Sequence, residues 1–145
     1  MTENYAYQAN QQNLNNNNDD ARLMSMLIFL LGFFTSIIGP IIIWAIKRNE
    51  ARLIDQAGKN YFNMIISYFI WNVVLGLLFI PIFLGFALNI DSLSIFLGLL
   101  VIILALAIFV ISILYIIFHI VACVKYFSGN EYVVPLSIRF LNRML

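Results

Sequence analysis

The stretch IIGPIIIWAIKRNE, residues 37–50, places a Gly-Pro pair inside an apolar run that then ends in charge. Proline lacks an amide hydrogen and its ring clashes with the carbonyl four residues earlier, so the pair predicts a kink in a helix. In a membrane, a neighbouring helix satisfies the freed backbone group. Trp44 is typical of interfacial depth, and Lys47 with Arg48 marks a cytoplasmic end. We therefore expect a packed, kinked membrane helix that ends here.

The composition of the whole chain is that of a membrane protein. Of 145 residues, 63% are hydrophobic and 10% are charged, and mean hydropathy is +0.94, whereas soluble domains carry about a quarter charged residues. Uncharged runs cover residues 23–46, 61–88 and 93–124, and each exceeds the roughly 18 residues that a membrane-spanning helix needs. The sequence predicts an all-α polytopic membrane protein with three transmembrane helices over about these ranges, in a single domain at 22–145.

The N-terminal tail, residues 1–21, has a different character. Its segment QANQQNLNNNNDD, residues 8–20, is rich in Asn and Gln and has almost nothing to bury. Such a segment does not offset its ordering entropy, so we expect a disordered tail. A cleavable signal peptide needs a basic start and a shorter apolar core, so the first apolar run is expected to be retained.

Basic residues predict the orientation, because Lys and Arg near span ends stay on the cytoplasmic side. Arg22 alone precedes the first apolar run. With three spans, the first connection and the C-terminal segment lie on the same side of the membrane. They carry the other seven basic residues: Lys47, Arg48, Arg52, Lys59, Lys125, Arg139 and Arg143. We expect a bacterial cytoplasmic (inner) membrane protein with its N-terminus outside, Asp91 outside, and the C-terminal segment 125–145 cytoplasmic.

The end of that segment, LSIRFLNRML at residues 136–145, alternates apolar and basic positions at helical spacing. Wound as a helix, it gathers apolar side chains on one face and Arg139 and Arg143 on the other. The pattern predicts a short amphipathic helix that lies at the membrane interface or against the first cytoplasmic connection.

Small and polar residues recur on one face of each predicted span. The sets are Gly98, Ala105, Ser112 and His119; Asn60, Asn63 and Ser67; and Gly32, Ser36 and Gly39 or Pro40. Small residues let helix backbones approach closely, so we expect the three faces to meet. Ser67, Ser112 and His119 are the intramembrane polar candidates, since such groups mark either packing or a polar pathway for a solute. Both interpretations stay open at this point.

The residues that would support catalysis or metal binding are missing from the predicted spans. No carboxylate lies inside a span, no Gly-rich phosphate loop is present, and no nucleophile has a base in a recognisable pattern. Cys123 is the one cysteine, which excludes an intrachain disulfide and a multi-cysteine metal site. We expect no enzyme activity, no catalytic or cofactor-binding residue, no bound metal or other cofactor, and no nucleic-acid partner.

Two separated motifs carry a family resemblance: GPIIIWAIKRNE followed by DQAGKNYFN, and ACVKYFSGNEYVVPLSIRF near the C-terminus. Together they resemble a bacterial family of small membrane proteins described as a domain of unknown function and similar to the twenty-kilodalton Tic subunit of the chloroplast inner-envelope translocon. The matched residues, structural or interacting in such a family, are Gly39, Pro40, Trp44, Lys47, Asp55, Gly58, Lys59, Asn63, Lys125, Gly129, Tyr132, Pro135 and Arg139. The resemblance implies a three-span integral membrane protein of unsettled activity.

Three functions follow as hypotheses. The first is a non-enzymatic helical module that sits in the lipid bilayer and assembles with itself or with a membrane-protein partner, as the small-residue faces indicate. The second is an oligomeric pathway for a small solute or an ion, lined by the polar side chains of the spans. The third is an envelope-stress or toxin-immunity protein, which the size and the predicted span number fit.

Overall fold

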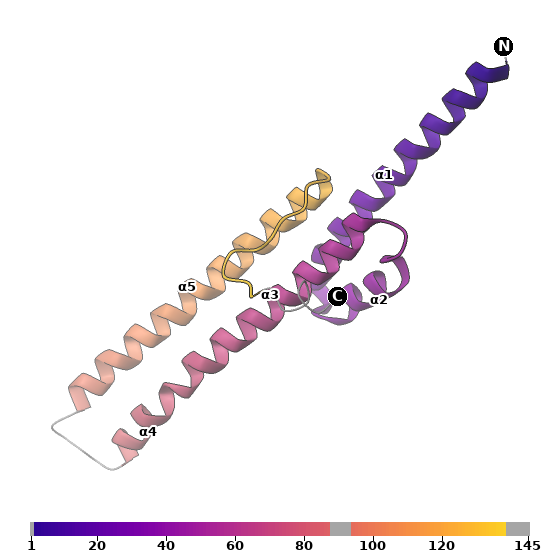
Figure 1. Cartoon of the computed structure of the whole chain (residues 1–145). Helices are drawn as coiled ribbons and strands as arrows, with labels where there is room; N and C mark the ends of the chain where they lie inside the picture. Colours follow the sequence, from indigo (N-terminus) through magenta and orange to yellow (C-terminus); the bar gives the residue numbers. More distant parts are fainter. Residues whose placement is uncertain (1, 88–93, 139–145) are drawn as a thin grey trace.

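The computed structural model describes residues 2–87 and 94–138, and the regular elements in these ranges are all α-helices (Figure 1). In chain order they are α1 (Thr2–Thr35), α2 (Ile38–Lys47), α3 (Arg52–Leu77), α4 (Phe79–Ala87) and α5 (Ser94–Phe127). The predicted all-α class is therefore confirmed. Asp91, expected outside the membrane, lies outside the described residues.

The chain reverses direction between α1 and α2. Ser36 has a φ of 55°, in the left-handed region that costs a residue other than glycine about 1–2 kcal/mol. After this turn α2 returns along α1, so that Lys47 and Met24 line the same cavity. In one straight helix these two residues would lie about 35 Å apart. A single straight helix over 23–46 is therefore not what the structure contains, and three transmembrane helices are not confirmed.

Pro40 explains where the reversal occurs. Its ring cannot sit against the carbonyl oxygen four residues earlier, which is that of Ser36, and it offers no amide hydrogen to that oxygen. The sequence pattern locates this freed carbonyl but predicts a kink. The structure contains a full turn, because α2 packs against both α1 and α3 and thereby buries Pro40.

α1 and α3 run in the same direction. Ala21 lines a cavity together with Ile54 near the start of both packed segments. Further along, the rings of Phe29 and Tyr61 meet edge to face with centroids 5.4 Å apart. Two parallel helices in succession require a return helix between them, and α2 is that helix.

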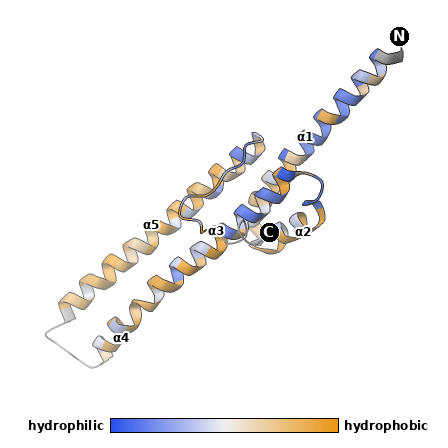
Figure 2. Ribbon diagram, viewed as in Figure 1, coloured by the Kyte–Doolittle hydropathy of each residue, from blue (hydrophilic) through white to orange (hydrophobic). Residues whose placement is uncertain are grey.

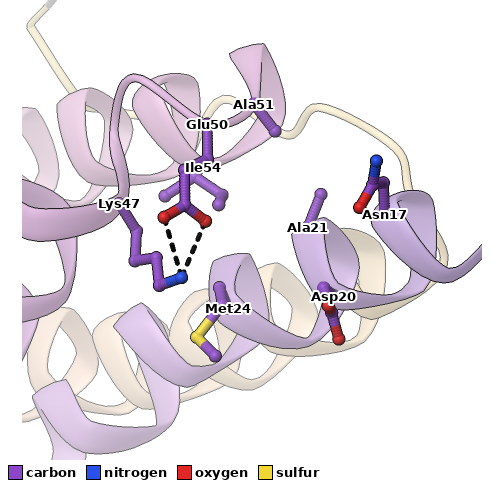
Figure 3. Close-up of a pocket in the computed structure, with 8 residues that line it drawn as sticks. All are labelled: Asn17, Asp20, Ala21, Met24, Lys47, Glu50, Ala51 and Ile54. Atoms are coloured by element: carbon purple, nitrogen blue, oxygen red, sulfur yellow. Dashed lines mark hydrogen bonds and ion pairs between the residues drawn. The ribbon is translucent and has the colours of Figure 1, made fainter. Parts of the chain in front are cut away.

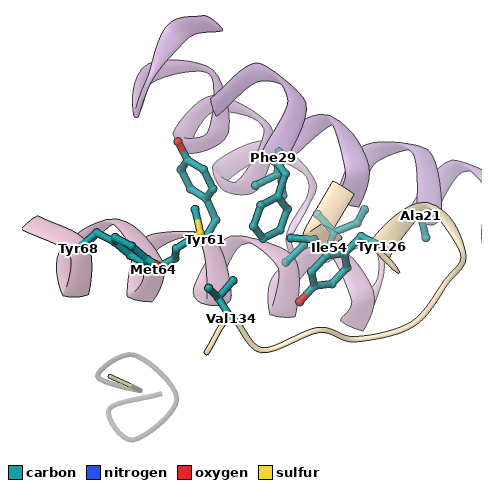
Figure 4. Packing of buried hydrophobic residues seen from close by; sticks show 11 residues of the cluster. Ala21, Phe29, Ile54, Tyr61, Met64, Tyr68, Tyr126 and Val134 are labelled. Carbon is teal, nitrogen blue, oxygen red and sulfur yellow. The ribbon is translucent and has the colours of Figure 1, made fainter. Parts of the chain in front are cut away.

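The main core lies where α1, α3 and α5 pack together (Figure 4). α5 runs antiparallel to α1: the ring of Tyr126 stacks on Phe29 at 5.2 Å, while His119 lies beside Phe33 at 5.6 Å. Tyr61, Phe29 and Tyr126 are fully buried. Large aromatic side chains in such offset and edge contacts dominate core energetics, so they hold the four helices of this end together.

The other end of the molecule is a pair of apolar helices. α4 continues α3 after a break at Leu78, whose amide donates to the Leu75 carbonyl at 3.2 Å, just before Pro81. Ile82 of α4 and Leu97 and Leu104 of α5 form a second, smaller core.

Two stretches, Arg52–Gly85 and Ile95–Phe127, are long and apolar enough to cross a membrane. Of their most apolar windows, 17% and 6% are buried inside the protein. Figure 2 shows that both helices are mostly hydrophobic along their length. A helix that is apolar all round needs an apolar environment, and the low burial means that the chain itself does not provide it. These two helices support the predicted membrane location, although not the predicted number of spans.

Both chain ends differ from expectation. Residues 2–20, predicted to be disordered, form the first half of α1, whose side chains from residue 4 to residue 20 are exposed. This half continues the helical hydrogen bonding of the packed half and extends beyond the bundle (Figure 1).

At the other end, residues 130–138 cross back over α3 without forming a helix, and Leu136 has a φ of 64°. The amphipathic helix predicted for 136–145 is thus absent from 136–138. Arg139 and the rest of that segment lie outside the described residues.

Candidate functional site

Many of the predicted site residues lie at the end of the molecule where α1, α2, α3 and α5 pack together, which we call the four-helix end. Buried polar groups there join segments that are distant in sequence. His119 is the clearest case. Its Nε2 lies 2.6 Å from the carbonyl oxygen of Phe29, and since a carbonyl only accepts, Nε2 carries the hydrogen. Four aromatic rings surround the imidazole, those of Phe29, Phe33, Tyr61 and Tyr115. His119 is 1% exposed, and it joins α5 to α1.

A second buried group fixes the C-terminal segment. Asn60 Nδ2 donates to the hydroxyl of Tyr126 at 2.7 Å and to the carbonyl of Tyr132 at 3.1 Å. The Tyr126 hydroxyl donates to the same carbonyl at 3.2 Å. Burial raises the pKa of the Tyr132 phenol, so this side chain stays neutral. Buried polar groups that satisfy one another specify one arrangement, here of α3, α5 and residues 130–134.

Ser67 ties the same segment to α3 at a second point. Its hydroxyl donates to the carbonyl of Asn63 at 2.7 Å and accepts the amide hydrogen of Ile138 at 2.7 Å. Ser67 and Asn63 are both buried. The polar face predicted on this helix therefore anchors the C-terminal segment.

The first connection is organised around Trp44. Its Nε1 donates to Asp55 Oδ1 at 3.1 Å, and Asp55 Oδ2 forms an ion pair with Lys59 Nζ at 2.7 Å. The indole lies directly on Gly58, where a side chain would collide with it. The guanidinium of Arg48 stands over the indole, 5.1 Å from its centroid, a favourable cation–π geometry. These motif residues dock α2 onto α3.

The α1–α2 turn is held by its own contacts. The hydroxyl of Tyr61 donates to the carbonyl of Ser36 at 2.7 Å, and the Gly39 amide donates to Thr35 Oγ1 at 3.1 Å. Gly32 lies against the Tyr61 ring, which leaves no space for a side chain. The small residues predicted on this face serve this close approach.

Gly129 ends α5. Its φ is 78°, its amide donates to the Tyr126 carbonyl, and the amide of Asn130 donates to the Lys125 carbonyl, both at 3.0 Å. This pair of bonds is a Schellman motif, which favours glycine at the left-handed position. A Cβ here would also lie 2.7 Å from Arg22 Nε. Pro135 is exposed in the following turn.

The three predicted faces meet only in part. Gly32, Asn60, Asn63, Ser67 and His119 are all inside the four-helix end. In contrast, Ala105 and Ser112 are exposed, and a Cβ on Gly98 would meet no atom within 4 Å. The polar candidates therefore do not line one shared path: Ser67 bonds the C-terminal segment, His119 bonds α1, and Ser112 bonds its own helix at Ile108.

Sequence reasoning missed the aromatic residues that connect these groups. Tyr61 and Tyr126 provide the hydroxyls that reach Ser36 and Tyr132, and Phe29 provides the carbonyl for His119. All three lie in runs rich in aromatic residues, so their type alone did not distinguish them. The signal that could have found the two tyrosines is a tyrosine placed beside polar residues in or next to a span, since a buried hydroxyl needs a partner.

A cavity of about 410 Å³ opens between α1 and the connection that follows α2 (Figure 3). The lining includes the Lys47–Glu50 ion pair, with Nζ 2.7 Å from Oε2. The remaining lining residues are Asn17, Asp20, Ala21, Met24, Ala51 and Ile54. Within the described part of the chain, no group of three or more His, Cys, Asp or Glu side chains could hold a metal ion.

Comparison with known proteins corrects the family assignment. A model of the MamF/MmsF family, described as the magnetosome magnetite crystal formation protein family, matches residues 20–141. No curated protein and no solved structure matches. The predicted Tic-like family is wrong, because both motifs that suggested it lie within the matched range. Those motifs dock helices and end them, a structural role that does not identify a translocon subunit. The chain belongs to the MamF/MmsF magnetosome magnetite crystal formation protein family.

Proposed function

We propose that this family member is a non-enzymatic membrane module that assembles laterally with a second copy of itself through the face of α5 that carries Gly98 and Ala105. The observation that carries the proposal is the uncovered stripe of Gly98 and Ala105, which continues to the exposed Ser112 at the edge of a cavity between α3 and α5. Small residues on an apolar helix let a second helix approach closely, and van der Waals packing then drives association within lipid. Through this assembly, the protein would organise the membrane in which the family forms magnetite crystals.

The hydrogen bonds and ion pairs of three carboxylates support a role without catalysis. Asp55 is held by Trp44 and Lys59. Glu50 pairs with Lys47, and Glu131 pairs with Arg52 at 3.3 Å. A general acid or base needs access to its substrate, whereas these groups connect neighbouring segments. Their arrangement is therefore that of a scaffold.

Cysteine cross-linking tests the assembly directly. In a Cys123→Ser background, Ala105→Cys should form a disulfide-linked dimer in native membranes under mild oxidation, because residue 105 lies on the uncovered stripe. Leu104→Cys is the matched control, since Leu104 is 7% exposed and packs within the α4–α5 core. If the Ala105→Cys variant stays monomeric under conditions that cross-link a known dimer, lateral assembly is rejected.

Magnetite crystal formation, the process for which the family is named, provides the second test. In the source bacterium without its own copy, the wild-type gene should restore the size distribution of magnetite crystals, measured by electron microscopy. The variant Ala105→Leu should fail to restore it while inserting normally in the membrane, because the larger side chain keeps two α5 backbones apart. Restoration by this variant, with the dimer lost, would separate crystal formation from assembly and contradict the proposal.

A further inference from the structure

We propose that α2 and the second half of α1 form a re-entrant hairpin, which enters one leaflet of the bilayer and returns to the same side. The occupant of its outer apolar face is then the acyl chains of that leaflet. The long helices α3–α4 and α5 cross the membrane, so the N-terminus lies on the same side as residues 48–51 and 128–138. This inference concerns topology and stands independently of the lateral assembly proposed above.

The packing direction of the helices leads to this topology. α3 leaves the 48–51 connection and runs toward the apolar end of the molecule (Figures 1 and 2). The second half of α1 runs parallel to it, as the pairs Ala21 with Ile54 and Phe29 with Tyr61 show. It therefore enters the membrane from the side on which α3 enters. A straight first span would need the opposite direction.

The length of the hairpin fits one leaflet. From Met24 to Thr35 the helix rises by about 18 Å, and α2 returns by about 15 Å. The hydrocarbon core is about 30 Å thick. The turn at Ser36 and Ile37 therefore reaches about the midplane, and neither arm is long enough to cross.

The outer surface of the hairpin suits lipid. Phe34 at the turn is 78% exposed, and Ile38 and Ile46 on α2 are 70% and 67% exposed. At the base of α2 the apolar face ends in Lys47 and Arg48, which suit the anionic headgroups of a cytoplasmic leaflet. An apolar face bounded by basic residues at one end matches a bilayer in both chemistry and depth.

Several backbone groups of the turn have partners, as backbone that leaves the helical pattern inside hydrocarbon needs. The Ser36 carbonyl accepts from the Tyr61 hydroxyl, and the Gly39 amide donates to Thr35 Oγ1. The Ile41 amide donates to the Ile37 carbonyl at 3.1 Å. The turn is therefore compatible with a position at the bilayer midplane.

Labelling with a membrane-impermeant maleimide tests the sidedness of the full chain in inverted and right-side-out vesicles. Single cysteines at Asn10, Asn49 and Asp91 are placed in a Cys123→Ser background. The hairpin predicts that positions 10 and 49 react from the same side and position 91 from the opposite side. Reaction of positions 10 and 49 from opposite sides would establish a straight span and overturn the proposal.

A disulfide across the turn gives a readout that does not depend on vesicle orientation. A Cβ on Gly39 would lie 3.0 Å from the Leu31 Cβ, close to the roughly 3.5–4.5 Å that a disulfide requires. Leu31→Cys with Gly39→Cys should close in membranes, with Thr35→Ala added to remove the nearby hydroxyl. The pair Ile103→Cys and Ile111→Cys has equal spacing within α5, where about 12 Å of helical rise prevents closure. Failure of the first pair to close more than this control would contradict the hairpin.

Discussion

The hydroxyl of Tyr61 donates to the carbonyl oxygen of Ser36 at 2.7 Å, and this bond joins α3 to the tip of the α1–α2 turn. The carbonyl is available because Pro40, four residues later, has no amide hydrogen to give it. One proline thus creates an acceptor in the apolar region, and one tyrosine from another helix satisfies it. The bond makes the hairpin and the α3 packing depend on each other.

Tyr61→Phe should therefore destabilise the protein by about 1–3 kcal/mol, the cost of leaving a buried acceptor without its donor. Chemical or thermal unfolding in detergent, followed by circular dichroism, measures the change. Tyr68→Phe is the matched control, because among the described residues the buried Tyr68 hydroxyl has no hydrogen-bond partner. That variant should be neutral or slightly stabilising. Equal effects of the two substitutions would contradict this role for Tyr61.

His119 is predicted to contribute mainly by filling space among aromatic rings. His119→Leu loses the bond to Phe29 but keeps most of the volume, so we expect a loss near the roughly 0.6 kcal/mol average for polar contacts between membrane helices. His119→Ala leaves a cavity and should cost about 2–4 kcal/mol. Unfolding measurements on both variants decide the point. Equally large losses for leucine and alanine would show that the hydrogen bond, which both variants lack, dominates over space filling.

The contact between Trp44 and Asp55 can be measured by a double-mutant cycle. Trp44→Phe keeps an aromatic ring on Gly58 but removes the indole donor, and Asp55→Ala removes its acceptor. For residues in direct contact we expect a coupling energy of about 0.5–1.5 kcal/mol. Asp55→Ala combined with Lys47→Ala provides the control, since Lys47 pairs with Glu50 instead. Strictly additive effects for Trp44 and Asp55 would mean that α2 docks by shape alone.

Alanine substitutions at Gly129 and Gly76 should change the stability of the protein in opposite directions. Gly129→Ala forces a side chain into the left-handed region and against Arg22, so a loss of about 1–2 kcal/mol is expected. Gly76 has helical backbone in the last turn of α3, just before α4 continues, and a Cβ there would meet no atom within 4 Å. Gly76→Ala should stabilise the helix by about 0.5–1 kcal/mol. Melting temperatures of the two variants should move in opposite directions.

The sequence predicts the helical class, because composition and apolar run length depend only on the environment that the chain needs. It also places Asn60, Asn63 and Ser67 on one face of a helix, and the structure buries all three. The direction of the first apolar run is not predictable in this way. A run of 24 residues has the same hydropathy whether it crosses the bilayer or folds back. The difference depends on Tyr61, a residue far along the chain that satisfies the turn.

The uncovered stripe on α5 is a second feature that the sequence alone does not predict. Gly98, Ala105, Ser112 and His119 share one spacing in sequence, yet the structure covers His119 and leaves the first three open. Periodicity indicates which face a residue is on, whereas coverage depends on where the neighbouring helix ends. Here α1 covers one end of α5, and the rest of α5 has α3 and α4 beside it.

Ser67 gives the most direct test of the C-terminal segment. Its hydroxyl accepts the amide hydrogen of Ile138 at 2.7 Å, so Ser67→Ala removes the acceptor and should release the segment locally. Hydrogen exchange should then speed up at Ile138 by roughly tenfold, corresponding to about 1.4 kcal/mol, the upper part of the range for a single hydrogen bond. Ser112→Ala is the control, because Ser112 is exposed and bonds only its own helix. Unchanged exchange at Ile138 in Ser67→Ala would show that the bonds of Asn60 hold the segment without Ser67.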